Sequence, residues 1–206
     1  MAYKPGDFFI GVIDFFGILL PGAILLYLHG KQLVELLGFP FHEDQAVKWA
    51  AFAVGSYVVG NFLLWIGAPL NRLLGLYRRE HKDSFYNEVK DIIKLPVGKN
   101  RTDVFNRAYS FVHIKNPSAL AEIERRMADF KLFRSLTVVF ALDFLLELFW
   151  EVSHWPRLAF SGILFILAAW RFLFLLDWTY RITFEYFALL TNDKLHPRRP
   201  EESRVA

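Results

Sequence analysis

The stretch WAAFAVGSYVVGNFLLWIGAPL, from Trp49 to Leu70, decides the fold class, because it runs for 22 residues without a charged side chain. An α-helix needs about 20 predominantly apolar residues to cross the roughly 30 Å hydrocarbon core of a bilayer. The stretch meets that length, and the sequence therefore predicts a transmembrane helix over residues 49–70.

Three further apolar stretches have a similar length, and each contains ionisable residues. The first is FFIGVIDFFGILLPGAILLYL, and the last is LAFSGILFILAAWRFLFLLDW. The three predicted spans are 8–28, 136–152 and 158–178. Their charged residues are Asp14, Asp143, Glu147, Glu151, Arg171 and Asp177. In total the sequence predicts four transmembrane helices.

Composition agrees with a membrane protein and excludes some chemistry. Apolar residues make up 54% of the 206, and the chain contains 22 Phe and 6 Trp. Four apolar blocks leave too little polar sequence to cover them in a soluble all-α domain. The chain has no Cys, which excludes thiolate metal sites and a cysteine nucleophile. No metal or cofactor is predicted.

The distribution of Lys and Arg predicts the orientation. Segment 71–134 is rich in basic residues, and 191–206 adds four, whereas loop 29–48 contains two and the last hairpin contains only Arg157. Short loops rich in Lys and Arg stay on the cytoplasmic side. We therefore predict a multi-pass protein of the bacterial inner (plasma) membrane with both termini in the cytoplasm.

The predicted fold class is an all-α four-helix transmembrane bundle with a small helical cytoplasmic part. Asn116-Pro117 is a helix start signal, and nothing after it breaks a helix before the third span ends. The third and fourth helices should therefore extend into the cytoplasm as a long stalk. The predicted parts are a transmembrane hairpin, a cytoplasmic helical region, a second hairpin with its extension, and a tail: 1–70, 71–134, 135–190 and 191–206.

Polar side chains within the spans are the candidate site. Counted from the inner boundary at 1.5 Å per residue, one group from each helix reaches nearly the same depth, about 10–13 Å, with a second acid slightly deeper. The predicted polar layer consists of Asp14, Asn61, Asp143, Glu147 and Arg171. Ionisable residues at such depth are functional candidates. The layer either lines a pore or relay, or holds Arg171 in an ion pair that fixes the packing of the bundle.

Basic residues next to the spans are the second candidate site. They flank the predicted membrane surface, where cationic side chains attract anionic lipids. We expect Arg72, Arg78, Arg79, Lys99 and Arg101 to bind lipid headgroups. Lipids and further copies of the chain are the expected partners, with a cytoplasmic protein as a further one; nucleic acid is disfavoured.

Arg107 and His113 match the loose Arg-x4–6-His pattern of HEPN ribonucleases. A chain with this Arg and His content gives about one such match by chance, and Ala108 stands where that family has a polar residue. The motif therefore supports only a third hypothesis, a membrane-tethered ribonuclease.

The stretch NPSALAEIERRMADFKLFRSL (116–136), with Asp14-Phe15-Phe16 and Pro21-Gly22, resembles uncharacterised small four-span bacterial membrane proteins. By architecture alone the chain is similar to membrane subunits of anti-phage systems, such as the Kiwa membrane component and type VI-B CRISPR accessory proteins. The resemblance implies an effector or sensor at the inner membrane, and fold-level analogy implies no activity.

These observations lead to three hypotheses of function. The leading one is a non-enzymatic membrane effector that forms homo-oligomers and acts on or senses the bilayer, in bacterial stress or antiviral defence. A small ion or solute channel or transporter that uses the polar layer as a pore is the alternative, and the ribonuclease is the third. Oligomers are expected because the acids within the spans outnumber Arg171 and need partners.

Overall fold

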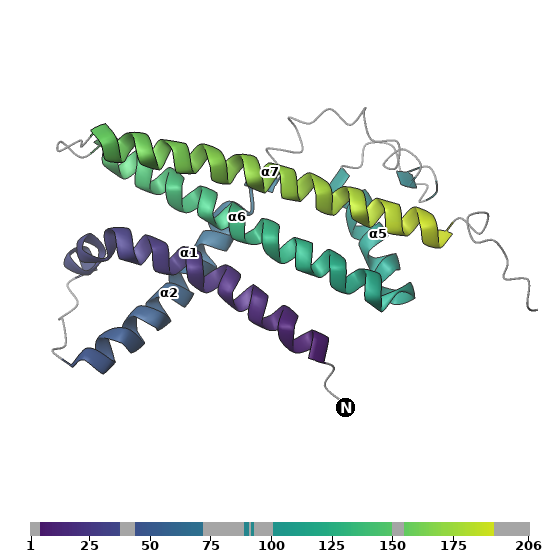
Figure 1. The fold of residues 1–206 in the computed structure, drawn as a ribbon, viewed down its shortest axis with the longest axis horizontal. Coiled ribbons are helices and arrows are strands. Elements are labelled where there is room, and N and C mark those ends of the chain that lie inside the picture. The colour runs from purple at the N-terminus through teal and green to yellow at the C-terminus, as the bar shows by residue number, and fades with distance from the viewer. Residues whose placement is uncertain are drawn as a thin grey trace, which may run out of the picture. The chain divides into compact units, whose positions relative to one another are not determined.

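The computed structural model describes residues 5–37, 44–71, 89–90, 92, 101–149 and 155–191. These residues form five helices and no strand (Figure 1). The helices are α1 (Pro5–Leu37), α2 (Gln45–Gly67), α5 (Arg101–Lys115), α6 (Pro117–Phe149) and α7 (Trp155–Thr191). The predicted all-α fold class is confirmed for this part of the chain.

Two of the described helices, α2 and α7, are long and apolar enough to cross a membrane. The sequence predicted four. α6 differs because its apolar half carries three charged residues, Arg134, Asp143 and Glu147. In α1 most side chains of the N-terminal half lie outside the described residues.

Two helix starts follow from their capping residues. α6 begins at Pro117, and the Asn116 side-chain oxygen accepts a hydrogen bond of 3.1 Å from the backbone N–H of Ala119, as the Asn-Pro pair predicted. α2 begins after Asp44, whose carboxylate accepts a 2.8 Å hydrogen bond from the N–H of Ala46. Of the cytoplasmic helical region predicted over 71–134, residues 72–88, 91 and 93–100 lie outside the described residues.

The chain divides into two compact units, and the boundary between them falls within α6 and α7. The first unit comprises Met1–Arg78 and Glu124–Asp177, and the second comprises Arg79–Ile123 and Trp178–Ala206. Both α6, with 33 residues, and α7, with 37, exceed the about 20 residues that a bilayer requires.

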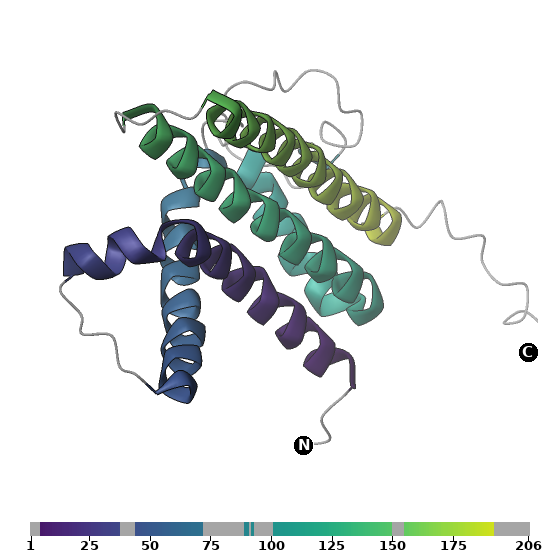
Figure 2. The same ribbon diagram turned by 60° about the vertical axis from the view of Figure 1, so that its left-hand side comes forward.

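In the first unit, α6 and α7 lie side by side and antiparallel (Figures 1 and 2). Their pairing is visible in two contacts: the Phe130 ring lies 6.4 Å from that of Phe172, and Phe144 packs over Gly162. α2 completes the core of this unit, because Leu63 is buried in one cluster with Val138 and Val139 of α6.

Helices α1 and α2 cross in the first unit with their backbones in close contact. A Cβ atom on Gly22 would lie 1.8 Å from the Ser56 carbonyl oxygen, and one on Gly60 would lie 2.0 Å from that of Ile18. Only glycine permits such an approach, which is the expected use of small residues between membrane helices. Pro21 lies next to this crossing, and Figure 2 shows that the two ends of α1 point in different directions.

The second unit packs α5 against the C-terminal part of α7 through aromatic rings. The Phe105 ring lies 4.4 Å from that of Tyr180, and Phe111 lies edge-on to Phe187 at 5.1 Å. A hydrogen bond also links α7 to α6 in this unit.

That hydrogen bond joins the Tyr186 hydroxyl to the Glu122 carboxylate at 2.6 Å. The bond, followed by burial and by the charges of Glu122 and Glu185, raises the pKa of Tyr186 above its usual value. The contact therefore stabilises the protonated phenol.

Candidate functional site: a buried Asp143 cluster

The most polar buried site in the described part of the first unit surrounds the carboxylate of Asp143 on α6. His29 of α1 lies with its Nε2 atom 2.8 Å from Asp143 Oδ1. Ser161 of α7 donates its hydroxyl hydrogen bond to the other oxygen, Oδ2. Only 4% of the surface of His29 and of Asp143 is exposed, and 1% of Ser161. Three helices thus meet at one carboxylate.

A second acid and a cation extend this site toward the α6–α7 connection. Arg157 Nε donates a hydrogen bond of 2.9 Å to Glu147 Oε1. A terminal nitrogen of the same guanidinium lies 3.9 Å from Asp143 Oδ1, within ion-pair distance but beyond a hydrogen bond. We call these five residues, His29, Asp143, Glu147, Arg157 and Ser161, the Asp143 cluster.

Helix periodicity explains why these side chains meet. Asp143 and Glu147 are four residues apart on α6, and Arg157 and Ser161 are four apart on α7, so each pair occupies one face of its helix. The antiparallel pairing of α6 with α7 brings the two faces together. His29 reaches the same point because α1 continues as a helix to Leu37.

The cluster joins three helices through ionisable groups that are largely removed from solvent. Asp143 and Glu147 lie within ion-pair distance of Arg157, and the His29 ring contacts Asp143. A buried charge without a partner is costly, so the contact among the three helices depends on these pairings.

The connectivity of the cluster does not match that of a nucleophilic triad. In a triad the histidine accepts the serine proton while the acid orients the histidine. Here the Ser161 hydroxyl and the His29 ring both bind Asp143. The arrangement joins three helices, but it does not activate Ser161.

Asp143 and Glu147 are the two residues of the predicted polar layer that the structure brings together. Asn61 lies on an exposed face of α2, where its Nδ2 donates a 2.8 Å hydrogen bond to the Tyr57 carbonyl of its own helix. The side chain of Asp14 lies outside the described residues.

Arg171 does not share the level of the Asp143 cluster, which corrects the predicted layer. Its guanidinium carbon lies 5.9 Å from the centre of the Phe133 ring and 5.5 Å from that of Phe174. Arg171 is ten residues beyond Ser161 on α7, which is about 15 Å along the helix. Asp143 and Arg171 have similar predicted depths from the inner membrane boundary. Along the paired helices α6 and α7, however, they do not lie opposite each other.

The sequence analysis missed three members of the cluster, His29, Arg157 and Ser161. His29 and Arg157 were placed just outside the spans, because the apolar runs end at Leu28 and begin at Leu158. The sequence did contain a signal for these contacts. His29 and Arg157 lie next to the predicted outer ends of their spans, and Asp143 and Glu147 lie near the outer end of the third span. If depth had been counted from the outer membrane boundary, it would have placed His29 and Arg157 close to these two acids.

A second buried cation lies where α2 ends. Arg134 of α6 is 8% exposed, and its terminal nitrogen donates a 3.3 Å hydrogen bond to the Leu64 carbonyl in the last turn of α2. Its Nε atom is buried without a hydrogen-bond partner. A cation at a helix C-terminus is electrostatically favourable, so Arg134 joins α2 to α6.

The other candidate sites are only partly described. Arg107 and His113 are both exposed on α5, and the His113 ring stacks on that of Tyr109 at 6.4 Å. Six residues of helix turn the two side chains about 120° apart, so they do not face a common point. The side chains of the five predicted lipid-binding residues lie outside the described residues.

No protein-family model matches this chain, and neither the curated proteins nor the solved structures give a match.

Proposed function

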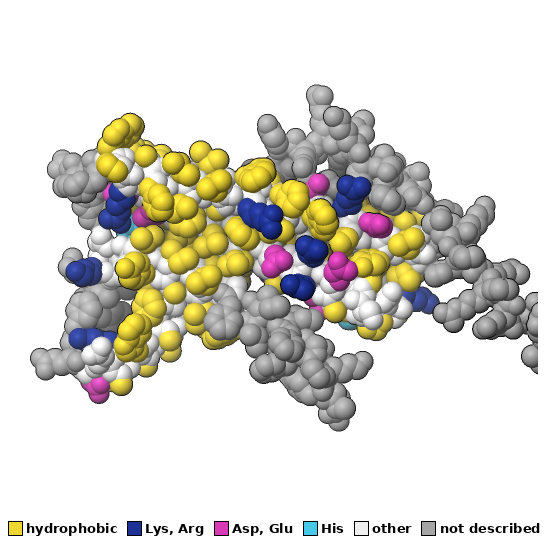
Figure 3. Space-filling view, viewed as in Figure 1, with side chains coloured by type: hydrophobic (Ala, Val, Ile, Leu, Met, Phe, Trp, Pro, Cys, Tyr) yellow, Lys and Arg dark blue, Asp and Glu magenta, His cyan; other side chains and the backbone are white. Residues whose placement is uncertain are grey.

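We propose that this chain is an integral membrane protein with four spans, one in each of α1, α2, α6 and α7. The exposed apolar surface of α2 and α7 carries the proposal: 22% of the most apolar stretch of α2 is buried, and 28% of that of α7. Core helices of a soluble protein bury that surface, whereas lipid tails solvate it. Figure 3 shows hydrophobic side chains spread over the face of the first unit.

Packing supports the extension from two spans to four. Leu63, in the C-terminal half of α2 and seven residues before the end of the predicted span 49–70, is buried against Val138 and Val139 of α6. Ile24 and Leu25 of α1 pack against the same cluster. If α2 crosses a bilayer, the segments of α1 and α6 that contact Leu63 lie at the same depth. The two acids in the C-terminal half of α6, Asp143 and Glu147, are enclosed in the Asp143 cluster and do not face lipid.

The proposed orientation has both termini in the cytoplasm, and single cysteines test it because the native chain has none. Arg79→Cys and Arg199→Cys should resist a membrane-impermeant maleimide in intact cells. Glu43→Cys and His154→Cys should react. Labelling of the Arg79 position from outside would overturn the orientation, and release of the protein by alkaline carbonate would overturn the insertion itself.

We propose further that the protein is non-enzymatic, self-associates, and acts on or senses the bilayer as an effector in bacterial stress or anti-phage defence. The exposed apolar side chains of α2, among them Val54, Phe62 and Trp65, support self-association. The test is to express the intact protein in cells challenged with phage and to record plating efficiency and membrane potential. Unchanged plating and potential across a panel of phages would contradict the effector role.

One observation favours the alternative of an ion or proton path. The Asp143 cluster brings two acids, a histidine and a hydroxyl together where three helices meet, as proton relays require. Purified protein in liposomes should then carry current or acidify the lumen under a proton gradient. Asp143→Asn should abolish the flux, and the matched variant Arg171→Gln should retain it.

A further inference from the structure

α2 carries two opposite stripes with the same spacing. Its buried residues are Ser56, Gly60, Leu63 and Gly67. Val54, Val58, Asn61 and Trp65 repeat this spacing of four, three and four residues, and all four are exposed. At 100° per residue the mean directions of the two sets differ by about 160°, so they occupy opposite sides of the helix. We call the second set the Asn61 stripe.

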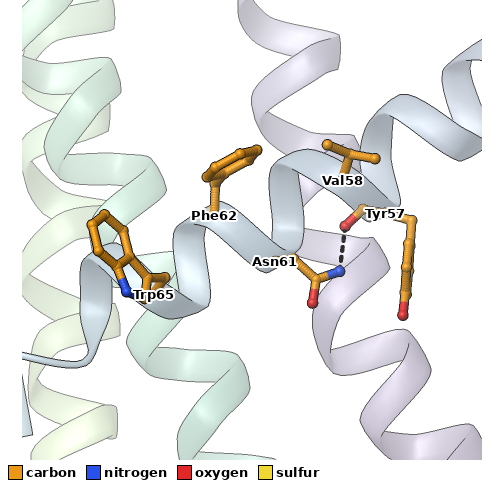
Figure 4. A pocket seen from close by; sticks show the side chains of 5 residues that line it. All are labelled: Tyr57, Val58, Asn61, Phe62 and Trp65. Carbon is orange, nitrogen blue, oxygen red and sulfur yellow. Dashed lines mark hydrogen bonds between the residues drawn. The ribbon is translucent and has the colours of Figure 1, made fainter.

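The stripe is apolar except at its centre. Trp65 is 77% exposed, Val54 65% and Val58 47%, and the neighbouring Phe62 is exposed as well. An open, shallow groove on the surface of α2 has an apolar lining, formed by Tyr57, Val58, Asn61, Phe62 and Trp65 (Figure 4). Asn61 itself lies near the middle of the predicted span, 49–70.

The amide of Asn61 retains unused hydrogen-bonding capacity. A primary amide offers two N–H donors and a carbonyl acceptor. One donor binds the Tyr57 carbonyl of the same helix, and within the described part of the chain the other N–H and Oδ1 have no hydrogen-bond partner. In hydrocarbon these groups find no partner in lipid tails, and a polar side chain at such a position promotes helix association.

We propose that the Asn61 stripe is the interface through which two copies of this chain associate, α2 against α2, with the two Asn61 amides hydrogen-bonded to each other. This inference rests on the proposed membrane insertion and self-association. All copies insert with one orientation, so a two-fold axis runs along the membrane normal and the paired helices are parallel. Each residue of the stripe then meets its own counterpart at the same depth.

The amide explains why the partner is a second copy. It is both donor and acceptor, so two amides related by a two-fold axis satisfy each other without any other group. The Val54, Val58 and Trp65 side chains follow the seven-residue repeat of a helix pair, in which a single central Asn fixes register and pairing. The opposite stripe is already occupied by α1 and α6, which leaves this one for the partner.

Cysteine cross-linking tests the interface in native membranes. Val58→Cys, Asn61→Cys and Trp65→Cys should form disulfide-linked dimers rapidly on mild oxidation. Ile163→Cys and Ile166→Cys are matched controls, because both are exposed apolar positions on α7, and they should cross-link at least tenfold more slowly.

Energy transfer between donor- and acceptor-labelled copies in lipid vesicles gives the affinity. Asn61→Val should weaken dimerisation about tenfold, equivalent to about 1.4 kcal/mol, and Asn61→Gln should stay within about threefold because it keeps the amide. Asn61 is exposed, so both variants should melt as the wild type does.

The outcomes separate this inference from the proposed function. If copies associate but cross-link through α7, or if Asn61→Val associates as the wild type does, the interface is wrong while self-association stands. If light scattering and energy transfer both report a monomer, self-association fails together with the interface. If Asn61→Val unfolds, the single-cysteine variants still test the interface. Rapid cross-linking at Val58→Cys and Trp65→Cys would support it, and cross-linking no faster than at the α7 controls would contradict it.

Discussion

Replacing Asp143 with leucine should destabilise the folded chain more than any single change at an exposed ionisable residue. The substitution leaves the Nε2 atom of His29 and the hydroxyl of Ser161 buried without their shared partner. A buried polar group without a partner costs about 1–3 kcal/mol, and breaking a buried pair costs about 3–5 kcal/mol in total. In a chain of this size each kcal/mol lowers Tm by about 2–4 °C, so Asp143→Leu should melt about 6–20 °C lower.

The assay is thermal unfolding in mild detergent, read as a double-mutant cycle with His29→Leu. Each single variant leaves a polar group unpaired, whereas the double variant removes both members of the pair. The double should therefore be less destabilised than the sum of the singles by on the order of 2 kcal/mol. Asp143→Asn tests the role of the charge alone, because asparagine has the same size and shape as aspartate. Its amide keeps one hydrogen-bond acceptor and replaces the other with a donor.

Arg171→Leu is the matched control for this cycle. Arg171 lies over Phe133 and Phe174 and is exposed, so its loss should cost at most about 1 kcal/mol. Additive effects of Asp143→Leu and His29→Leu would refute the Asp143 cluster. If the double-mutant cycle showed an interaction energy between Asp143 and Arg171 instead, it would support the single polar layer that the sequence predicted.

Two further predictions concern packing and pH. Gly60→Leu should separate α1 from α2 and lower the free energy of unfolding by about 3 kcal/mol or more, because even a Cβ atom there would lie 2.0 Å from the Ile18 carbonyl oxygen. Gly30→Ala has open space and should be neutral or stabilising by up to about 1 kcal/mol in the same melting assay, so equal melting of the two variants would contradict the crossing. Because the pKa of Tyr186 is raised, its contribution to stability is present below about pH 10 and disappears as pH rises through the raised value. Wild type and Tyr186→Phe should therefore differ in Tm at pH 8, and the difference should shrink as pH rises above the usual tyrosine pKa. A difference that stays constant over that rise would contradict the role of the protonated phenol.

Much of the helical architecture could be predicted from local signals. The Asn116-Pro117 pair fixed the start of α6, and apolar length located α2 and α7. The ends of the helices were less predictable. An apolar run marks the part of a helix that crosses the membrane, and the helix can continue beyond it. α1 runs nine residues past Leu28, and this extension carries His29 into the bundle.

The partners of the polar residues could not be predicted from depth alone. Depth along a span is counted from a boundary that a sequence locates only to within a few residues, and one helical turn decides which side chains meet. Arg171 shows the error on α7, and Asn61 shows a second one: its direction around α2 was as important as its depth. Direction follows from which face packs, and the Ser56 and Gly60 contacts with α1 set that face.

The structure also changes the reason for expecting oligomers. The sequence predicted association because acids within the spans lacked partners, but Asp143 and Glu147 are satisfied by His29, Ser161 and Arg157 inside one copy. The amide of Asn61 on α2 retains unused hydrogen-bonding capacity, and it faces outward. Stability of one copy and association between copies therefore depend on different residues. Variants of Asp143 should lower Tm without a change at the α2 interface, and Asn61→Val should change association without a change in Tm.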